Sequence, residues 1–182
     1  MQTFMAFSSY SKTATALDDA RLGKQRLEAY QVLEHLLEIP GRENFYPNHP
    51  IMAMWRGYEY ALCVYGMETC RVWHTRGKDD MFHRFARYGT MFNNQGFDFE
   101  HPPWYRDEDF MRSHRSNLYR KDPRYYRAFS PARGTPLNLP YLWPSVSEDG
   151  SYRLLVSAAD RKRIAMAERA LPDDLAARLG LA

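Results

Sequence analysis

Residues 16–38 have the sequence ALDDARLGKQRLEAYQVLEHLLE, and their pattern gives the clearest indication of the fold class. Its apolar residues recur at about 100° per residue, so one side of a helix would face a core while a polar stripe runs beside it. The apolar side holds Leu22, Ala29, Tyr30, Leu33, Leu36 and Leu37. Pro40-Gly41 follows, and such a pair stops a helix. The stretch therefore predicts a helix from about Ala16 to Glu38.

Helical patterns also occupy most of the remaining chain. After a Pro47–Pro50 turn we expect a long helix that ends near Arg76, in which Gly57 and Gly66 allow a bend or a close neighbour. Further helices are expected over 81–92, 107–121, 158–170 and 172–179. Residues 123–144 are rich in proline and aromatic residues, a composition that predicts irregular wrapping over the core.

The sequence thus predicts an all-α fold with one compact helical domain. A chain of 182 residues, 45% of them hydrophobic, is long enough to bury a core. We expect residues 1–145 to form this domain and residues 146–182 to form a short helical appendage packed on it. Ser145–Ser151 would be the linker between them.

The sequence lacks the marks of several other protein classes. It has no run of about 18 apolar residues, and residues 1–7 lack the basic stretch and long apolar core of a signal peptide. We therefore expect a cytoplasmic protein without a membrane span. Cys63 and Cys70 would lie roughly 10 Å apart along a helix, beyond the ~7 Å limit for a disulfide, which predicts buried free thiols. The six histidines show no zinc-ligand spacing, so no structural metal is expected.

The positive charge of the chain gathers in one segment. The formal net charge is only +3, but residues 110–133 hold seven arginine or lysine residues against a single acid, Asp122. The same segment carries Tyr119, Tyr125, Tyr126 and Phe129. Cations suit phosphate oxygens, and aromatic rings can stack on exposed bases. The segment therefore predicts contact with nucleic acid, and the alternative is a basic solvated helix whose aromatic residues pack inward.

A second pattern lies in the expected helix over 16–38. Arg21, Gln25 and Glu28 follow at i, i+4 and i+7 and so share one helical face. A carboxylate flanked by hydrogen-bond donors can move a proton and stabilise the cation-like sugar of glycosidic chemistry. The alternative is a solvated face on which Lys24 and Glu28 form an i, i+4 pair.

The Asn48-His49-Pro50 turn directly precedes an expected helix N-terminus. A histidine at such a place can act as an acid or donate a hydrogen bond to a phosphate. The aromatic residues around Trp104 and Trp143 are expected to be core or wrapping contacts.

Four blocks in the chain resemble, in the same order, bacterial and phage pyrimidine-dimer DNA glycosylases of the endonuclease V type. The blocks begin at Leu17-Asp18-Asp19, Asn48-His49-Pro50, His114-Arg115-Ser116-Asn117 and Pro140-Tyr141, and the likeness covers residues 1–145. The resemblance implies an all-helical enzyme that flips a nucleotide out of the duplex and cleaves the glycosidic bond at a pyrimidine dimer. It also implies that Glu28 is the essential acid and that the α-amine of the chain is the nucleophile, which forms a Schiff base and permits cleavage at the abasic sugar.

The patterns and the resemblance together give the expected site residues. Four residues are expected to be catalytic, namely Glu28, Met1 through its amine, Arg21 and His49. The side chains expected to contact DNA are Lys24, Gln25, Asn48, Arg112, His114, Arg115, Ser116, Asn117, Arg120 and Lys121. No cofactor is expected, and the protein is expected to act on double-stranded DNA as a monomer.

Position 2 departs from the family pattern. The family exposes its amine by removing the initiator Met before a Thr, whereas this chain has Gln2, whose long side chain should block that removal. Three nucleophiles therefore stay open, namely the Met1 amine, Lys24, or a water molecule directed by Glu28. An α-amine has a reference pKa of ~8 against ~10.4 for lysine, so Met1 is favoured over Lys24.

Other functions would use some of the same residues. A non-enzymatic nucleic-acid-binding module would need the basic segment but not Glu28. A metal-dependent nuclease could recruit Asp18, Asp19 and Glu28, although the two aspartates point about 100° apart on a helix. A glycosylase that attacks modified phage bases would need the same base-flipping machinery as one that attacks dimers.

Overall fold

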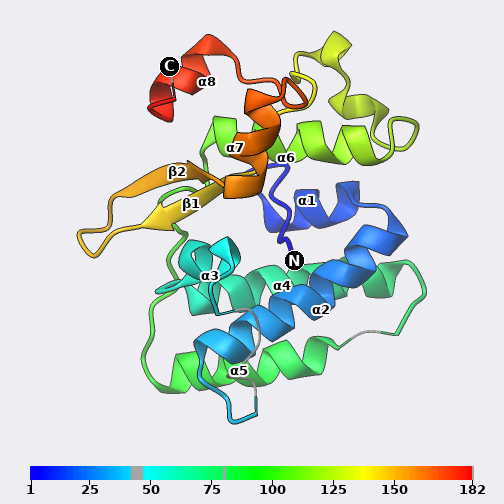
Figure 1. Cartoon of the computed structure of the whole chain (residues 1–182). Coiled ribbons are helices and arrows are strands. Elements are labelled where there is room, and N and C mark those ends of the chain that lie inside the picture. The colour runs from blue at the N-terminus through cyan, green and yellow to red at the C-terminus, as the bar shows by residue number, and fades with distance from the viewer. Residues whose placement is uncertain (42–46, 80, 182) are drawn as a thin grey trace. The chain divides into compact units, whose positions relative to one another are not determined.

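The computed structural model describes residues 1–41, 47–79 and 81–181. Contacts divide the chain into an N-terminal unit, residues 1–105, and a C-terminal unit, residues 106–182. The described residues are mainly helical, with one small sheet of two strands (Figure 1), so the predicted all-α class is confirmed. Within the described ranges, no helix combines the length and the apolar character that crossing a membrane requires.

Helices α1 to α5 belong to the N-terminal unit. Their bounds are α1 (Tyr10–Ala16), α2 (Asp19–Leu36), α3 (Pro50–Trp55), α4 (Glu59–Thr75) and α5 (Phe82–Asn94) (Figure 1). α4 packs against α1, α2 and α5, and its inward residues Leu62 and Tyr65 are fully buried. Cys63 and Cys70 on the same helix are buried free thiols, as predicted from their spacing.

The helix expected over Ala16–Glu38 is confirmed as α2, with a later start. Asp18 has extended backbone, and its carboxylate accepts a hydrogen bond from the Arg21 N–H at 2.9 Å, which caps the first turn. The preceding residues form a separate helix, α1, capped by the Ser9 hydroxyl. The sequence patterns did not predict α1, because seven residues are too few for a clear helical period.

The single long helix expected after the Pro47–Pro50 turn is wrong, because α3 and α4 are separate. Gly57 lies between them with a φ of 83°, a backbone conformation that glycine adopts without strain. The Glu59 carboxylate accepts a hydrogen bond from the Gly57 N–H at 2.9 Å and fixes this break. Gly66 stays helical and admits a close neighbour, as expected, since a Cβ there would lie 2.1 Å from a ring carbon of Phe85.

The first seven residues form no helix or strand and enter the core of the N-terminal unit. Thr3, Phe4, Met5 and Ala6 are all buried. Their backbone is neither in a helix nor in a sheet, so side chains of the surrounding helices must satisfy its polar groups. The start of the chain is therefore held from inside the unit.

The C-terminal unit combines helices with a hairpin. Its elements are α6 (Glu108–Lys121), the short 3-10 helices η1 (Arg127–Phe129) and η2 (Pro131–Arg133), β1 (Leu142–Val146), β2 (Tyr152–Val156), α7 (Ala158–Ala165) and α8 (Asp173–Arg178). The expected linker at Ser145–Ser151 is wrong, because β1 and β2 pair antiparallel with Leu142 opposite Val156. Pro144 suggested irregular structure, but a strand in a two-stranded sheet tolerates proline at the edge without a partner.

Ion pairs fasten the last residues to the rest of the C-terminal unit. Arg178 on α8 pairs with Asp107 and Asp109 at the start of α6. Arg169 donates to the Asp160 carboxylate and to the Asn117 side-chain oxygen, both at 3.2 Å. Contacts divide the chain after residue 105, whereas the sequence predicted a division after residue 145. Whether residues 1–145 fold as one domain stays a prediction.

Candidate active site

Gln25 joins α2 to the first residues of the chain. Its Nε2 donates to the Gln2 carbonyl oxygen at 2.8 Å, and its Oε1 accepts from the Phe4 N–H at 2.7 Å. Only 1% of Gln25 is exposed. A neighbouring β-strand would bond the same two main-chain groups, a carbonyl and an N–H two residues apart. The Gln25 side chain takes the place of such a strand and fixes how the segment lies along α2.

Tyr65 of α4 and Trp55 of α3 hold the same segment. The Tyr65 hydroxyl lies 2.7 Å from the Gln25 Oε1 and 3.1 Å from the Phe4 carbonyl oxygen. Trp55 donates from Nε1 to the hydroxyl of residue 3 at 2.8 Å. Burial raises the pKa of Tyr65, and the nearby charge of Glu28 raises it further, so the hydroxyl keeps its proton and donates.

Glu28 lies one helical turn after Gln25 and contacts the very start of the segment. Its Oε2 accepts a hydrogen bond from the main-chain N–H of Gln2 at 3.0 Å. The residue is half-buried. Because Met1 is joined to that nitrogen, the Met1 amine lies within one residue's length of an atom that contacts the carboxylate.

His49 stands immediately before α3, near the same chain end. Burial lowers the pKa of His49, and the positive N-terminal amine lowers it further, which places the imidazole within electrostatic reach of Met1. Its Nδ1 accepts a hydrogen bond from the Ile51 N–H at 3.2 Å, so Nε2 carries the proton in the neutral ring. Asn48 beside it is exposed.

The remaining expected residues of α2 lie in three different settings. Arg21 forms an ion pair with Asp18. Lys24 is exposed. Gln25 is buried, which differs from the DNA-contacting position expected for it, because its amide is bonded to the main chain of the first residues.

The three carboxylates of the nuclease alternative have separate partners. Asp19 accepts from Arg76 at 2.8 Å and from Lys78 at 2.6 Å, and these bonds, that of Lys78 first, lower its pKa. Asp18 is paired on its own helix, and Glu28 faces the first residues. Among the described residues, no group of three or more histidines, cysteines or acids could hold a metal ion.

The residues that converge on the chain end, Gln25, Glu28, His49 and Tyr65, all lie in the first 84 positions. Residues 1–84 match the pyrimidine dimer DNA glycosylase family. The resemblance is confirmed over this segment, and the match supports a DNA glycosylase role. Searches of curated proteins and of solved structures found no match.

The glycosylase family match ends before α6, where other expected DNA contacts lie, and three of these are buried. Asn117 donates to the carbonyl oxygens of Ser113 and Leu139, at 2.9 and 3.0 Å, and Ser116 accepts from the Leu139 N–H at 3.0 Å. The His114 ring lies 4.3 Å from that of Phe110, centroid to centroid. These positions differ from the expected DNA-facing ones, because the three side chains hold the C-terminal unit together.

The charged residues of α6 and the segment after it remain at the surface. Arg112 is paired with Asp109, and Arg115 with Glu108. Arg120 and Lys121 are exposed at the end of the helix. Beyond them the exposed residues include Arg124, Tyr125, Arg127 and Arg133. The basic segment expected from the sequence is therefore a basic surface.

Sequence reasoning missed two residues that hold the chain end, Tyr65 and Trp55. Both fit the apolar period of a core helix, so nothing in the pattern separates a structural aromatic residue from one that positions the site. It also missed Arg169, an arginine in a mixed charged stretch. For Tyr65 and Trp55, the signal that could have found them is that a buried N-terminal segment without regular structure needs side-chain hydrogen-bond partners.

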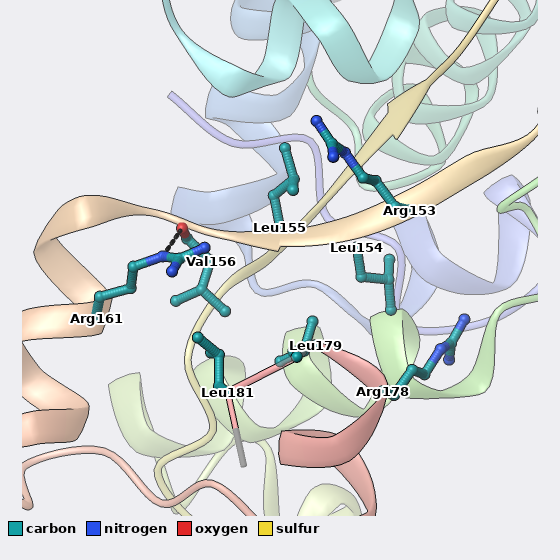
Figure 2. Close-up of a pocket in the computed structure, with 9 residues that line it drawn as sticks. Arg153, Leu154, Leu155, Val156, Arg161, Arg178, Leu179 and Leu181 are labelled. Carbon is teal, nitrogen blue, oxygen red and sulfur yellow. Dashed lines mark hydrogen bonds between the residues drawn. The ribbon is translucent and has the colours of Figure 1, made fainter.

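A cavity of about 280 Å³ lies in the C-terminal unit between β2 and the residues around α8 (Figure 2). Leu154, Val156, Leu179 and Leu181 supply apolar lining. The arginines that line it include Arg161, which donates to the Val156 carbonyl oxygen at 3.3 Å, and Arg178. Among the described residues that line it, none has a carboxylate side chain.

Proposed function

We propose that the protein is a DNA glycosylase that cleaves the N-glycosidic bond of a damaged pyrimidine, with a pyrimidine dimer as substrate and cleavage at the abasic sugar as a second step. The observation that carries the proposal is the 3.0 Å hydrogen bond between the Gln2 N–H and Glu28 Oε2. It joins the start of the chain to a half-buried carboxylate within the segment that matches the family.

In the proposed reaction the Met1 amine is the nucleophile. Its lone pair attacks C1′ while the bond from C1′ to the base breaks. The base keeps the electron pair of that bond, takes up a proton from solvent and stays joined to its dimer partner. Glu28 accepts the proton that the amine gives up and stabilises the cationic sugar. Opening of the sugar ring leaves an imine between Met1 and C1′, after which removal of a C2′ proton expels the 3′ phosphate.

His49 supports this chemistry by staying neutral. Its lowered pKa keeps a second positive charge away from the amine at neutral pH. Its Nε2–H can donate a hydrogen bond to the departing base or to a phosphate. Arg21 remains a predicted supporting residue, with its charge directed at Asp18.

DNA contact is proposed for the exposed basic residues at the end of α6 and after it. Arg120, Lys121, Arg124 and Arg127 offer charge to phosphates, and Tyr125 is 49% exposed and able to stack on a base. A stacking residue beside phosphate contacts suits an enzyme that must take a nucleotide out of the duplex. The monomeric state and the cytoplasmic location stay predictions.

A second nucleophile is favoured by the same hydrogen bond. The nitrogen that lies 3.0 Å from Glu28 is that of Gln2, an amide while Met1 is attached. Removal of Met1 would turn this nitrogen into the α-amine without any movement of the chain. The long side chain of Gln2 disfavours that removal, so the Met1 amine is the first proposal.

Borohydride trapping tests the proposal. Duplexes with a dimer, an abasic site or a modified pyrimidine are incubated with the protein, and borohydride is added during turnover. We expect cleavage of the glycosidic bond at the dimer and a stable protein–DNA adduct that peptide mapping places on Met1, because borohydride reduces an imine to an amine. Lys24→Ala should spare the adduct, whereas an N-terminal extension should abolish the adduct and strand cleavage.

Each other outcome assigns a different chemistry. An adduct on Gln2 identifies the processed chain end, and one on Lys24 transfers the role to that side chain. Glycosidic-bond cleavage without an adduct makes water the nucleophile. Binding without base release favours the non-enzymatic module, and release of modified bases alone would replace the dimer as substrate.

A further inference from the structure

The hydrogen bonds of Gln25 specify a register as well as a position. Backbone N–H and C=O groups of an extended chain alternate in direction, and Gln25 uses one donor and one acceptor to bind residues 2 and 4. A slip by one residue would point the wrong groups at the amide and move the chain by about 3.3 Å. A register shifted by one residue therefore satisfies neither bond.

The acid is tied to this register because it stands on the same helix. Gln25 and Glu28 are separated by three residues on α2, so the helix backbone fixes the spacing between the amide and the carboxylate. Tyr65 reaches the same amide oxygen from α4 and keeps the side chain from turning away.

We infer that Gln25, supported by Tyr65, is a positioning residue that sets the register of the N-terminal segment and thereby delivers the nucleophilic amine to Glu28. The inference rests on the proposed amine chemistry and adds to it the residues that place the amine. It applies to the amine of Met1 and to that of a processed Gln2, since both are carried by the same segment. A misplacement of about 1 Å can cost roughly a hundredfold in rate, so a register error would abolish the reaction.

The test measures the single-turnover rate of borohydride trapping on abasic duplex DNA, together with the Kd for the same DNA. Gln25→Leu keeps the volume and removes both bonds. We expect its trapping rate to fall by at least about tenfold while its Kd stays within about twofold of the wild-type value. Thr69→Val is the matched control, because among the described residues this buried hydroxyl on α4 bonds within its own helix, to the Gly66 carbonyl oxygen.

Gln25→Glu adds a readout that a merely structural role would not move. Its ionised carboxylate has no donor for the Gln2 carbonyl oxygen, whereas the protonated acid again offers one donor and one acceptor. The trapping rate of this variant, divided by that of the wild type at the same pH, should therefore rise as the pH falls from about 8 towards about 5. The same ratio for Gln25→Leu should stay flat.

Tyr65→Phe keeps the test decisive if Gln25→Leu does not fold. It removes one hydroxyl and should lower the trapping rate by about fivefold at unchanged Kd, the effect of roughly one hydrogen bond. Trapping at the wild-type rate in the folded variants overturns the inference, as does a loss of trapping that only follows a loss of DNA affinity. No adduct in the wild type rejects the amine chemistry itself and this role with it.

Discussion

Helices α2 and α6 each use a buried side-chain amide to hold a neighbouring segment, but the two segments have different roles. On α2, the amide of Gln25 bonds the main chain of residues 2 and 4, and on α6 the amide of Asn117 bonds the main chain at Leu139. Each helix thus holds an extended segment with a buried side-chain amide. The segment on α2 carries a chain end beside a carboxylate, whereas the segment on α6 continues into β1. A buried polar residue therefore acquires a chemical role only from what its partner segment carries.

The largest expected effect is a loss of stability in acid, which would show that the buried side chains of α6 have a structural role. Burial lowers the pKa of His114 to about 3 from an ordinary 6.5, and the neighbouring Arg115 contributes a smaller share. A depressed pKa in the folded state gives stability that is complete above pH 6.5 and is lost as the pH falls towards 3. At ~1.36 kcal/mol per pH unit, up to about 5 kcal/mol of unfolding free energy depends on this ring.

Denaturant unfolding of the wild type and His114→Phe from pH 7 to pH 4 measures this effect. The variant should show a shallower loss of stability over that range, because it has no buried ring to protonate. Carboxylates such as Asp107 titrate in both proteins and cancel in the difference. Parallel curves would mean that His114 is not responsible for acid sensitivity.

The variant Glu28→Gln tests whether the carboxylate on α2 has a chemical role. This variant keeps an acceptor for the Gln2 N–H but cannot take a proton, so base excision should fall by at least about a hundredfold. Folding and DNA affinity should stay nearly unchanged. Excision rates, DNA Kd and Tm must be measured on the same preparation. Undiminished excision would remove Glu28 from the mechanism, and a joint fall of Tm and affinity would make it architectural, like Asn117.

The smallest expected effect concerns the surface of α6. Arg120→Ala should flatten the dependence of DNA affinity on salt by about one unit, the value for one lost phosphate contact. Arg115→Ala should flatten it less, because Arg115 must leave Glu108 to reach a phosphate. Affinities across a salt series check both. Arg161→Ala removes the same charge outside the basic segment and should leave the slope unchanged, while unchanged slopes in all three variants would place the DNA elsewhere.

The helical period predicted α2 and the shared face of Gln25 and Glu28, because such spacing is a local property. It could not predict that this face turns toward the chain's own first residues, since that depends on packing between distant segments. For the same reason the sequence predicted that Asn117 and His114 contact DNA, whereas both side chains are buried. The hairpin was missed because Pro144 and the polar turn at 147–151 give the composition of a loop.

Residue 2 makes two hydrogen bonds to α2 through its main chain, one from its N–H to Glu28 and one to its carbonyl oxygen from Gln25. Atoms of that kind are present in every residue except proline, which lacks the N–H. These two bonds therefore do not depend on which side chain position 2 carries, as long as it is not proline. They do depend on the spacing between residues 2 and 4, because Gln25 bonds both, so an insertion or deletion between these residues should disturb the segment more than a substitution there.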